Sequence, residues 1–211
     1  MTNLTKLLEI ASAPIREVGA DLNWINDTFG PIPLKMLEPI LKMKNGFYAF
    51  EGALHVLSDV GTSSEVGLFD WNSESLWRSE YHGMDEGAFF FAEDVFGSQF
   101  CIHRDGVYSF DPETGSFTSM ASGIEEWAGQ VLGDYELWTG HNLARDWQEQ
   151  HGALSIGHRL LPVTPFVLGG EFTVANLHSI EAVNGMRYRA SIAVQIKDLP
   201  DGASVKLQVI E

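Results

Sequence analysis

Short apolar runs separated by turn-forming residues occupy the centre of the chain, and they constrain its fold more than any other feature. The runs AFFFAEDVF, SQFCIHR, VYSFD and SFTSMA, between residues 88 and 121, are separated by the segments RDG (104–106) and DPETG (111–115). In the first segment Gly106 is expected to adopt a positive φ; in the second, Asp111-Pro112 opens a type I turn that Gly115 can close. Such short connections join antiparallel strands, so the sequence predicts a meander of at least three strands.

Helical patterns precede this meander. Residues 1–13 have the pattern of a short amphipathic helix, and residues 22–29 place apolar side chains at helical spacing. A third helix is predicted to end at Asn45-Gly46, since these residues readily adopt the left-handed conformation that follows a helix. Pro39 lies inside that pattern, so the helix either begins near Pro39 or is kinked there. The segments FYAF (47–50) and ALHVL (53–57) are then predicted to be short strands.

Helices are also expected after the meander. Ser122 and Glu125 have the spacing of a capping box, which predicts a helix from there to Gly133. Another helix is predicted over 141–151. The tail is predicted to return to strands, in the segments 160–172, 187–199 and 203–211, with LPDGA (199–203) as the turn of a closing hairpin. The order of elements predicts an α+β fold with an antiparallel sheet.

The bulk composition is that of one packed domain spanning residues 1–211. Hydrophobic residues make up 45% of the 211, enough for a sizeable core without disulfides or metals. No run approaches the ~18 apolar residues of a membrane helix. A single cysteine, Cys101, excludes an intramolecular disulfide, and a cytoplasmic location is the default expectation.

Negative charge is concentrated in the middle of the chain. The net charge is −16, and residues 45–144 hold seventeen acids (Asp or Glu) but only two basic residues, Arg78 and Arg104. Such a charge repels nucleic acid and anionic lipid and attracts basic proteins. The sequence therefore predicts an acidic docking face, although an acidic surface that only maintains solubility stays open as an alternative.

Adjacent carboxylates occur at Asp85-Glu86 and at Glu93-Asp94, but they do not form a recognisable acid/base pair. Neighbouring residues on a strand point to opposite faces, so adjacency does not bring two carboxylates together. Glu93-Asp94 lies between two strand segments, where acids accept backbone N–H groups or discourage edge pairing. These four acids are predicted to be structural or to contact a partner, with catalysis as the remaining alternative.

Other motifs give little indication of chemistry. The seven histidines show no H-E-x-x-H spacing, and no phosphate loop or nucleophile elbow occurs, so neither a metal nor a cofactor is predicted. Cys101 and His103 share a strand face without a visible activating environment, which favours a core cysteine. Trp71, Trp77 and Trp138 lie near predicted loops and are candidates for exposed anchors at an interface.

The order of these elements resembles the SUKH superfamily of Smi/Knr-like proteins. The resemblance covers about residues 20–135. It rests on four segments: PLKMLEPILKMKNGFYAF, FFFAEDVFGSQFCI, GVYSFDPETGSFTSMA and SGIEEWAGQVL. The remainder, about 136–211, looks like an extension found in a bacterial subgroup. Pro39 departs from the family pattern, in which the proline more usually precedes the helix.

The resemblance implies helices packed on a curved antiparallel sheet, with a C-terminal helix and β-hairpin extension, and a protein-binding role. Many bacterial members are similar to immunity proteins that neutralise toxins, often nucleases, and the family has no shared catalytic residues. We therefore expect a non-catalytic module that binds a basic protein, with Asp85, Glu86, Glu93, Asp94, Trp71 and Trp77 as interface candidates. The alternatives are a housekeeping or small-molecule-binding domain, or a hydrolase using Glu93, Asp94 and His103. The oligomeric state is left open.

Overall fold

A six-stranded antiparallel sheet forms the centre of the protein. In the computed structural model, the structure describes residues 1–17, 22–200 and 202–203, and the sheet order is β1-β2-β3-β4-β5-β6. The predicted α+β fold with an antiparallel meander is therefore confirmed. The strands are β1 (Phe47–Ala49), β2 (Leu54–Val56), β3 (Ala88–Glu93), β4 (Gln99–His103), β5 (Gly106–Asp111) and β6 (Ser116–Ala121).

Both faces of the central strands are covered, which explains the three consecutive phenylalanines. Phe91 packs against Trp127, and Phe90 packs against Trp77. Because successive strand residues point to opposite faces, the two rings contact different layers. All six residues of β3 are buried, so an uninterrupted apolar run suits this strand better than strict alternation.

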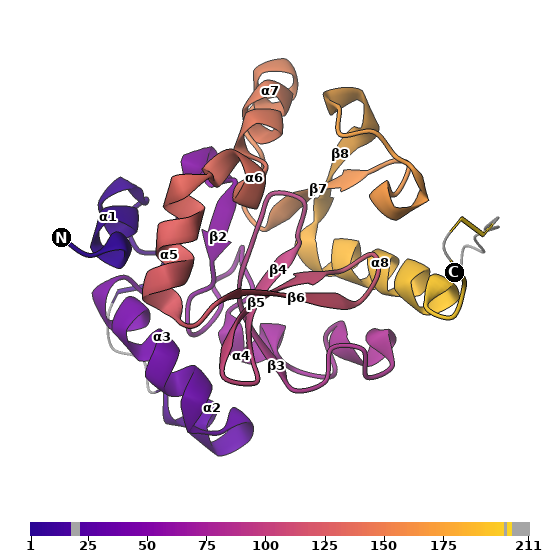
Figure 1. Ribbon diagram of the computed structural model, residues 1–211. Helices are drawn as coiled ribbons and strands as arrows, with labels where there is room; N and C mark the ends of the chain where they lie inside the picture. The colour runs from indigo at the N-terminus through magenta and orange to yellow at the C-terminus, as the bar shows by residue number, and fades with distance from the viewer. Residues whose placement is uncertain (18–21, 201, 204–211) are drawn as a thin grey trace.

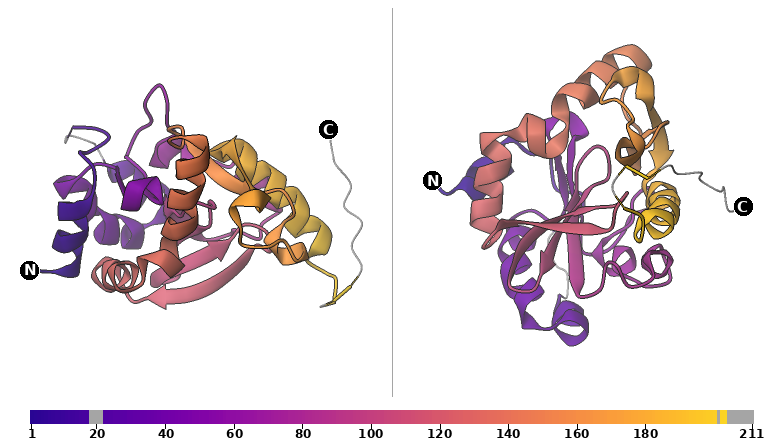
Figure 2. Two further views of the ribbon diagram at one scale, coloured as in Figure 1. Left: turned by 90° about the horizontal axis from the view of Figure 1, so that it is seen from above. Right: turned by 45° about the vertical axis from the view of Figure 1, so that its right-hand side comes forward.

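Helices lie on opposite sides of the sheet (Figures 1 and 2). The helices near the N-terminus are α1 (Asn3–Ile10), α2 (Asn23–Phe29) and α3 (Pro31–Met43). They lie on the side of α5 (Ile124–Gly133), which is followed by α6 (Tyr135–Thr139) and α7 (His141–His151). Helix α8 (Ala182–Ile196) lies on the other side, next to the 3-10 helix η2 (Arg78–Tyr81).

A second sheet joins the C-terminal part to the first one. Strands β7 (His158–Pro162) and β8 (Leu177–Glu181) pair antiparallel. The amide of Leu160 donates to the Val95 carbonyl, and the amide of Val95 donates to the carbonyl of Thr139 at the end of α6. The corner between β3 and β4 is therefore enclosed by α6 and β7. The short elements η1 (Phe50–Gly52), α4 (Leu68–Trp71), η3 (Phe166–Leu168) and η4 (Val174–Asn176) complete the described fold.

Helix α8 corrects the strand predicted over residues 187–199. Its buried residues include Val183, Met186, Ala190 and Ala193, which recur at three- and four-residue spacing. The β-branched Ile192 favoured a strand, but the helical period of the buried positions prevails because packing overrides local propensity. The closing hairpin predicted around LPDGA (199–203) is wrong in its first strand, which is helical up to Ile196. Its second strand, predicted over 203–211, lies almost entirely outside the described residues.

Local details of the N-terminal half also differ from the prediction. Helix α3 begins at Pro31, so of the two alternatives for Pro39 a helix start there is wrong, and Pro39 lies inside the helix. In the RDG turn, Arg104 adopts the positive φ, of 55°, that was expected at Gly106. Ser122 donates its amide and its hydroxyl to Glu126, while Glu125 accepts the amides of Asn3 and Leu4. Glu125 therefore caps α1 instead of its own helix.

Candidate functional site

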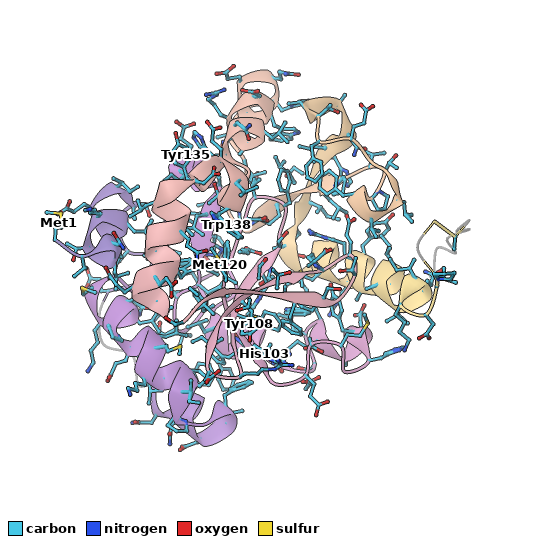
Figure 3. The ribbon with its side chains drawn as sticks, in the orientation of Figure 1. Met1, His103, Tyr108, Met120, Tyr135 and Trp138 are labelled. Atoms are coloured by element: carbon cyan, nitrogen blue, oxygen red, sulfur yellow. The ribbon has the colours of Figure 1, made fainter. Side chains whose placement is uncertain are left out.

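Two of the three tryptophans proposed as exposed anchors are core residues. Trp71 is 1% exposed and donates its indole N–H to Gln99, while Trp77 is 0% exposed and packs between Trp71 and Tyr81. Their predicted exposure is wrong, because the chain between β2 and β3 folds under the sheet. Trp138, the third candidate, is half-buried on α6 (Figure 3).

Asp85 is buried in a closed ion pair, whereas its neighbour Glu86 is exposed. The Nε atom of Arg78 lies 2.5 Å from Asp85 Oδ2, and Arg78 Nη2 donates to the Asp85 carbonyl at 3.1 Å. Arg78 Nη1 donates to the Asn72 carbonyl at 3.3 Å. A partner therefore cannot contact Asp85 in this conformation, and of this pair only Glu86 remains available to a docking face.

Glu93 is the centre of a buried polar cluster formed by strands β2, β3, β4 and β7. Its Oε1 atom lies 2.8 Å from Arg159 Nε and 3.0 Å from His55 Nδ1, and its Oε2 atom accepts from Gln99. Burial opposes the ionised form, but the charge of Arg159 and the hydrogen bonds from His55 and Gln99 outweigh it. Together they lower the pKa of Glu93 to about 2. Glu93 is therefore an ionised internal group and not an exposed contact.

Asp94 has a turn role at the corner between β3 and β4. Its carboxylate accepts the amide of Ser98 at 2.8 Å, and the residue is 8% exposed. Burial raises the pKa of this carboxyl to about 7, against the lowering effect of the Ser98 hydrogen bonds. The structural role considered for Glu93-Asp94 therefore matches their positions, while the exposed partner contact does not.

A pocket of about 290 Å³ opens beside the Glu93 cluster. Its lining combines three carboxylates, two histidines, three hydroxyl side chains and an apolar wall. The pocket is lined by Glu65, Glu93, Glu181, His55, His158, Thr62, Ser63, Ser64, Leu57, Val66, Trp71, Ile156, Gly157 and Ala182. No lysine or arginine is among these residues, so the pocket presents carboxylates without a lining cation.

His55 has one ring nitrogen engaged and the other without a partner. Glu93 can only accept a hydrogen bond when ionised, so Nδ1 of His55 carries the proton and Nε2 is left as an acceptor. Burial, the largest influence, lowers the pKa of His55, which keeps the ring neutral. Nε2 has no hydrogen-bond partner among the described residues and lies 4.0 Å from Glu65 Oε1. Two acceptors therefore face each other with no donor between them.

Tyr48 holds Glu65 in this position. The phenol hydroxyl of Tyr48 donates a short hydrogen bond to Glu65 Oε1, and burial raises the pKa of Tyr48 above its ordinary value. The Tyr48 ring stacks on His55 with centroids 4.4 Å apart, and the Arg159 guanidinium lies 5.7 Å from the Tyr48 ring centroid. The ring therefore fixes the positions of both Glu65 and His55.

A second, adjoining pocket of about 400 Å³ shares a wall with the first. Thr62, Glu65 and Val66 line both, and the second pocket extends over Val60, Gly61, Asp70, Ser73, Ser75 and Leu76. Again no lysine or arginine lines it. Phe69 and Val60, 55% and 47% exposed, are exposed apolar side chains of the same segment. We call the two pockets together the acidic pocket pair.

The acidic block of the sequence is divided between core and surface. Five of the seventeen acids are buried, namely Asp59, Asp85, Glu93, Asp94 and Glu113. Three of these five lie within 4 Å of an arginine side chain. Part of the negative charge that suggested a docking face is therefore neutralised inside the protein.

The residues proposed for a hydrolase do not come together. His103 pairs with Ala88 at one end of the β3-β4 ladder, whereas Glu93 pairs with Gln99 at the other. The His103 ring stacks on Phe117 and meets Tyr108 edge-on. His103 and Tyr108 are labelled in Figure 3. Cys101 is buried, and burial raises the pKa of its thiol, so it is not an activated nucleophile. No group of three or more potential metal ligands occurs in the part of the chain that the structure describes.

Sequence reasoning missed His55, Glu65 and Arg159. His55 lies directly opposite Glu93 in the β2-β3 register, which the structure shows and no sequence motif indicates. Arg159 lies 66 positions after Glu93 and reaches it only through the pairing of β7 beneath the corner, a contact that no local pattern predicts.

Comparison with known proteins supports the fold and leaves the activity open. No family model matches the chain, and no curated protein matches it. Among solved structures, the protein is similar to Atu4351 from Agrobacterium tumefaciens, with a TM-score of 0.55 and 14% sequence identity over 87% of this chain and 86% of that one. No helix in the described ranges is long and apolar enough to cross a membrane. At this identity the likeness extends to the fold alone.

Proposed function

We propose that this chain is a non-catalytic protein-binding module, of the immunity type, that binds a basic protein such as a nuclease toxin. The proposal places the interface at the acidic pocket pair and the exposed residues around it. It also places the protein in the cytoplasm, without nucleic acid or membrane as a partner.

One observation carries the proposal. The acidic pocket pair is lined by the carboxylates of Glu65, Asp70 and Glu181, besides the arginine-paired Glu93, and by no lysine or arginine. A concave surface with carboxylates of one sign attracts cations and raises the rate at which a basic partner associates. The exposed Phe69 offers an apolar contact next to these charges, and aromatic contacts contribute much of the energy of protein interfaces.

Two further features support the immunity-type assignment. The resemblance to the SUKH superfamily in the segments quoted above implies a binding role without shared catalytic residues. Twelve of the seventeen acids in the central block are not buried, so a negative surface remains after the internal ion pairs are subtracted.

Association kinetics test the proposal. The partner to use is the product of a basic, toxin-like reading frame next to the gene, with cytochrome c as a control for unspecific attraction. Raising the salt from 0.05 to 0.5 M shortens the Debye length to under about 5 Å, so the association rate should fall at least about tenfold. Asp70→Asn should slow association in low salt, and the exposed Glu9→Gln should not. An association rate that ignores salt contradicts the proposal.

A second candidate function, small-molecule binding, is favoured by a different observation. The buried Nε2 atom of His55 lacks a donor and belongs to the lining of a pocket near the ~300 Å³ lower limit of typical ligand sites. Small-molecule binding at the pocket without any protein partner would replace the first candidate.

A further inference from the structure

We infer that the pocket beside His55 binds a primary ammonium group. The ammonium donates hydrogen bonds to His55 Nε2 and to Glu65. The inference rests on the proposed function in one respect: in a protein complex this ammonium belongs to a lysine side chain of the basic partner. It adds the chemical identity of the bound group and the atoms that hold it.

The spacing of the two acceptors suits a single nitrogen atom. His55 Nε2 and Glu65 Oε1 are 4.0 Å apart, too far for a direct hydrogen bond even if one of them carried a proton. If a nitrogen lay about 2.9 Å from each acceptor, the angle at the nitrogen between the two acceptors would be about 90°. An ammonium has three donors and no acceptor, so it can serve both atoms at once.

A second hydrogen bond fixes the position of each acceptor group. His55 Nδ1 donates to Glu93, which leaves Nε2, 4.0 Å from Glu65 Oε1, as an acceptor, and the His55 side chain is 4% exposed. Glu65, at 7% exposed, is held by the Tyr48 hydroxyl. A buried acceptor without a donor is unfavourable. A cationic donor would remove that cost at His55 Nε2 and would add a charge-assisted hydrogen bond to Glu65, which so far accepts from Tyr48.

The charge around the pocket favours a cation over an anion. Arg159 lies near the Tyr48 ring that stacks on His55, but it is paired with Glu93 at 2.8 Å and is not part of the pocket lining. Arg16, which donates to the Gly61 carbonyl of the adjoining pocket, is not part of either lining. Glu65 and Glu181 then remain as lining carboxylates without a lining arginine or lysine. A bound ammonium would therefore meet two carboxylates that are not paired with a cation.

The walls of the pocket suit an alkyl chain. Leu57, Val66, Ile156 and Ala182 line it beside the polar groups. A lysine side chain combines a four-carbon apolar stem with a charged head, and such side chains bury the stem against apolar surface. The pocket lining combines both kinds of surface, with acceptors for the charged head and apolar side chains for the stem.

A titration of the folded protein with lysine derivatives tests the inference. The probes are Nα-acetyl-lysine N-methylamide, the same compound acetylated at Nε, and n-butyrate, each followed through the side-chain ¹⁵N resonances of His55. We expect saturable binding of the lysine derivative with a change at Nε2, and at least about tenfold weaker binding of the Nε-acetylated compound. Equal binding of these two compounds, or preferential binding of butyrate, would overturn the inference.

Variants locate the site. Glu65→Gln keeps the shape of the side chain and removes its charge, so it should weaken binding of the lysine derivative at least about tenfold. The matched control is Glu86→Gln, which makes the same charge change at an exposed position outside the pocket and should leave binding unchanged. Equal weakening by both variants would reduce the effect to net charge and overturn the site. The comparison of acetylated and free lysine needs no variant and remains decisive if Glu65→Gln folds poorly.

Further measurements distinguish a free amine from a protein lysine as the source of the ammonium. They also distinguish failure of this inference from failure of the proposed function. Binding of n-butylammonium as tight as that of a lysine-containing peptide indicates a free amine as the ligand, and much tighter peptide binding indicates a protein lysine. Both results support the ammonium site. If the lysine derivative binds but the basic protein does not, the proposed function fails and the inference stands. If the protein binds wild type and Glu65→Gln equally, the inference fails and the proposed function stands.

Discussion

Two buried arginine–carboxylate pairs lie on this sheet, and they are completed in different ways. Arg78 and Asp85 come from the segment before β3, and all three donor groups of Arg78 have acceptors within 3.3 Å. Arg159 and Glu93 join β7 to β3 as an ion pair, with Arg159 Nε 2.8 Å from Glu93 Oε1. Neither Nε nor Nη2 of Arg159 has a hydrogen-bond partner among the described residues, nor has the neighbouring His55 Nε2.

This difference distinguishes charged residues that stabilise the fold from charged residues that can bind a ligand. A closed pair has no unused hydrogen-bonding group for a ligand. It only stabilises the surrounding segment of the chain. An incomplete cluster carries the energetic cost of unpartnered atoms, and it persists where the surrounding fold over-determines it. Here the incomplete cluster is the one that borders a pocket, so we assign structure to Arg78–Asp85 and ligand contact to the cluster around Glu93.

The largest change in stability is expected when the Arg78–Asp85 pair is broken. Asp85→Ala leaves the buried Arg78 charge with only the exposed Glu74, 3.8 Å away, so it should lower the free energy of unfolding by about 3–5 kcal/mol, as measured by urea denaturation. Binding of the lysine derivative to the folded fraction should not change. Asp105→Ala, an exposed control, should stay within about 0.5 kcal/mol of wild type. An Asp85→Ala protein as stable as wild type would show that the closed pair is not structural.

An intermediate effect is expected at the incomplete cluster. Glu93→Gln removes the counter-charge of Arg159 but keeps an acceptor for His55 Nδ1, so the cost at pH 7 should be roughly 2–3 kcal/mol. The variant also tests pH dependence. The pKa of Glu93 is about 2 in the fold against an ordinary value of 4.5, so its contribution is full above pH 4.5 and is lost as the pH falls toward 2.

Urea denaturation between pH 2 and 7 measures this contribution. The stability difference between wild type and Glu93→Gln should be constant above about pH 5 and should shrink at lower pH. A difference that is the same at pH 3 and pH 7 would contradict the ionised, arginine-paired Glu93.

The smallest effect on stability is expected for a substitution at the pocket. Tyr48→Phe removes the hydroxyl that holds Glu65 while keeping the ring that stacks on His55. We expect a loss of about 1 kcal/mol in unfolding free energy and roughly threefold weaker binding of the lysine derivative. Tyr108→Phe, on β5 away from the pocket, is the control for removing a phenol. Unchanged lysine binding in Tyr48→Phe would mean that Glu65 needs no support from Tyr48.

The sheet could be predicted from sequence because its information is local. The turn residues at 104–106 and 111–115 lie directly between the strands they join, and β3 to β6 follow in chain order. Helix α8 could not be recognised from β-branched residues such as Ile192, since its helical period emerges only when the buried face is known.

The candidate site was only partly predictable, because it depends on contacts between distant segments. Glu93 was identified from its position between two strands, but its burial results from β7 and α6, which cover the corner. The exposure expected of Trp71 and Trp77 failed for a related reason: proximity to a loop does not reveal that the loop folds beneath the sheet.

The most direct test of this account is one titration with Nα-acetyl-lysine N-methylamide, in which the side-chain ¹⁵N resonances of His55 and Arg78 are followed together. The account predicts a saturable change at His55 Nε2 and none at Arg78 Nε. Equal changes at both sites, or no change at His55 at saturating concentrations, would contradict the division between the closed pair and the open cluster.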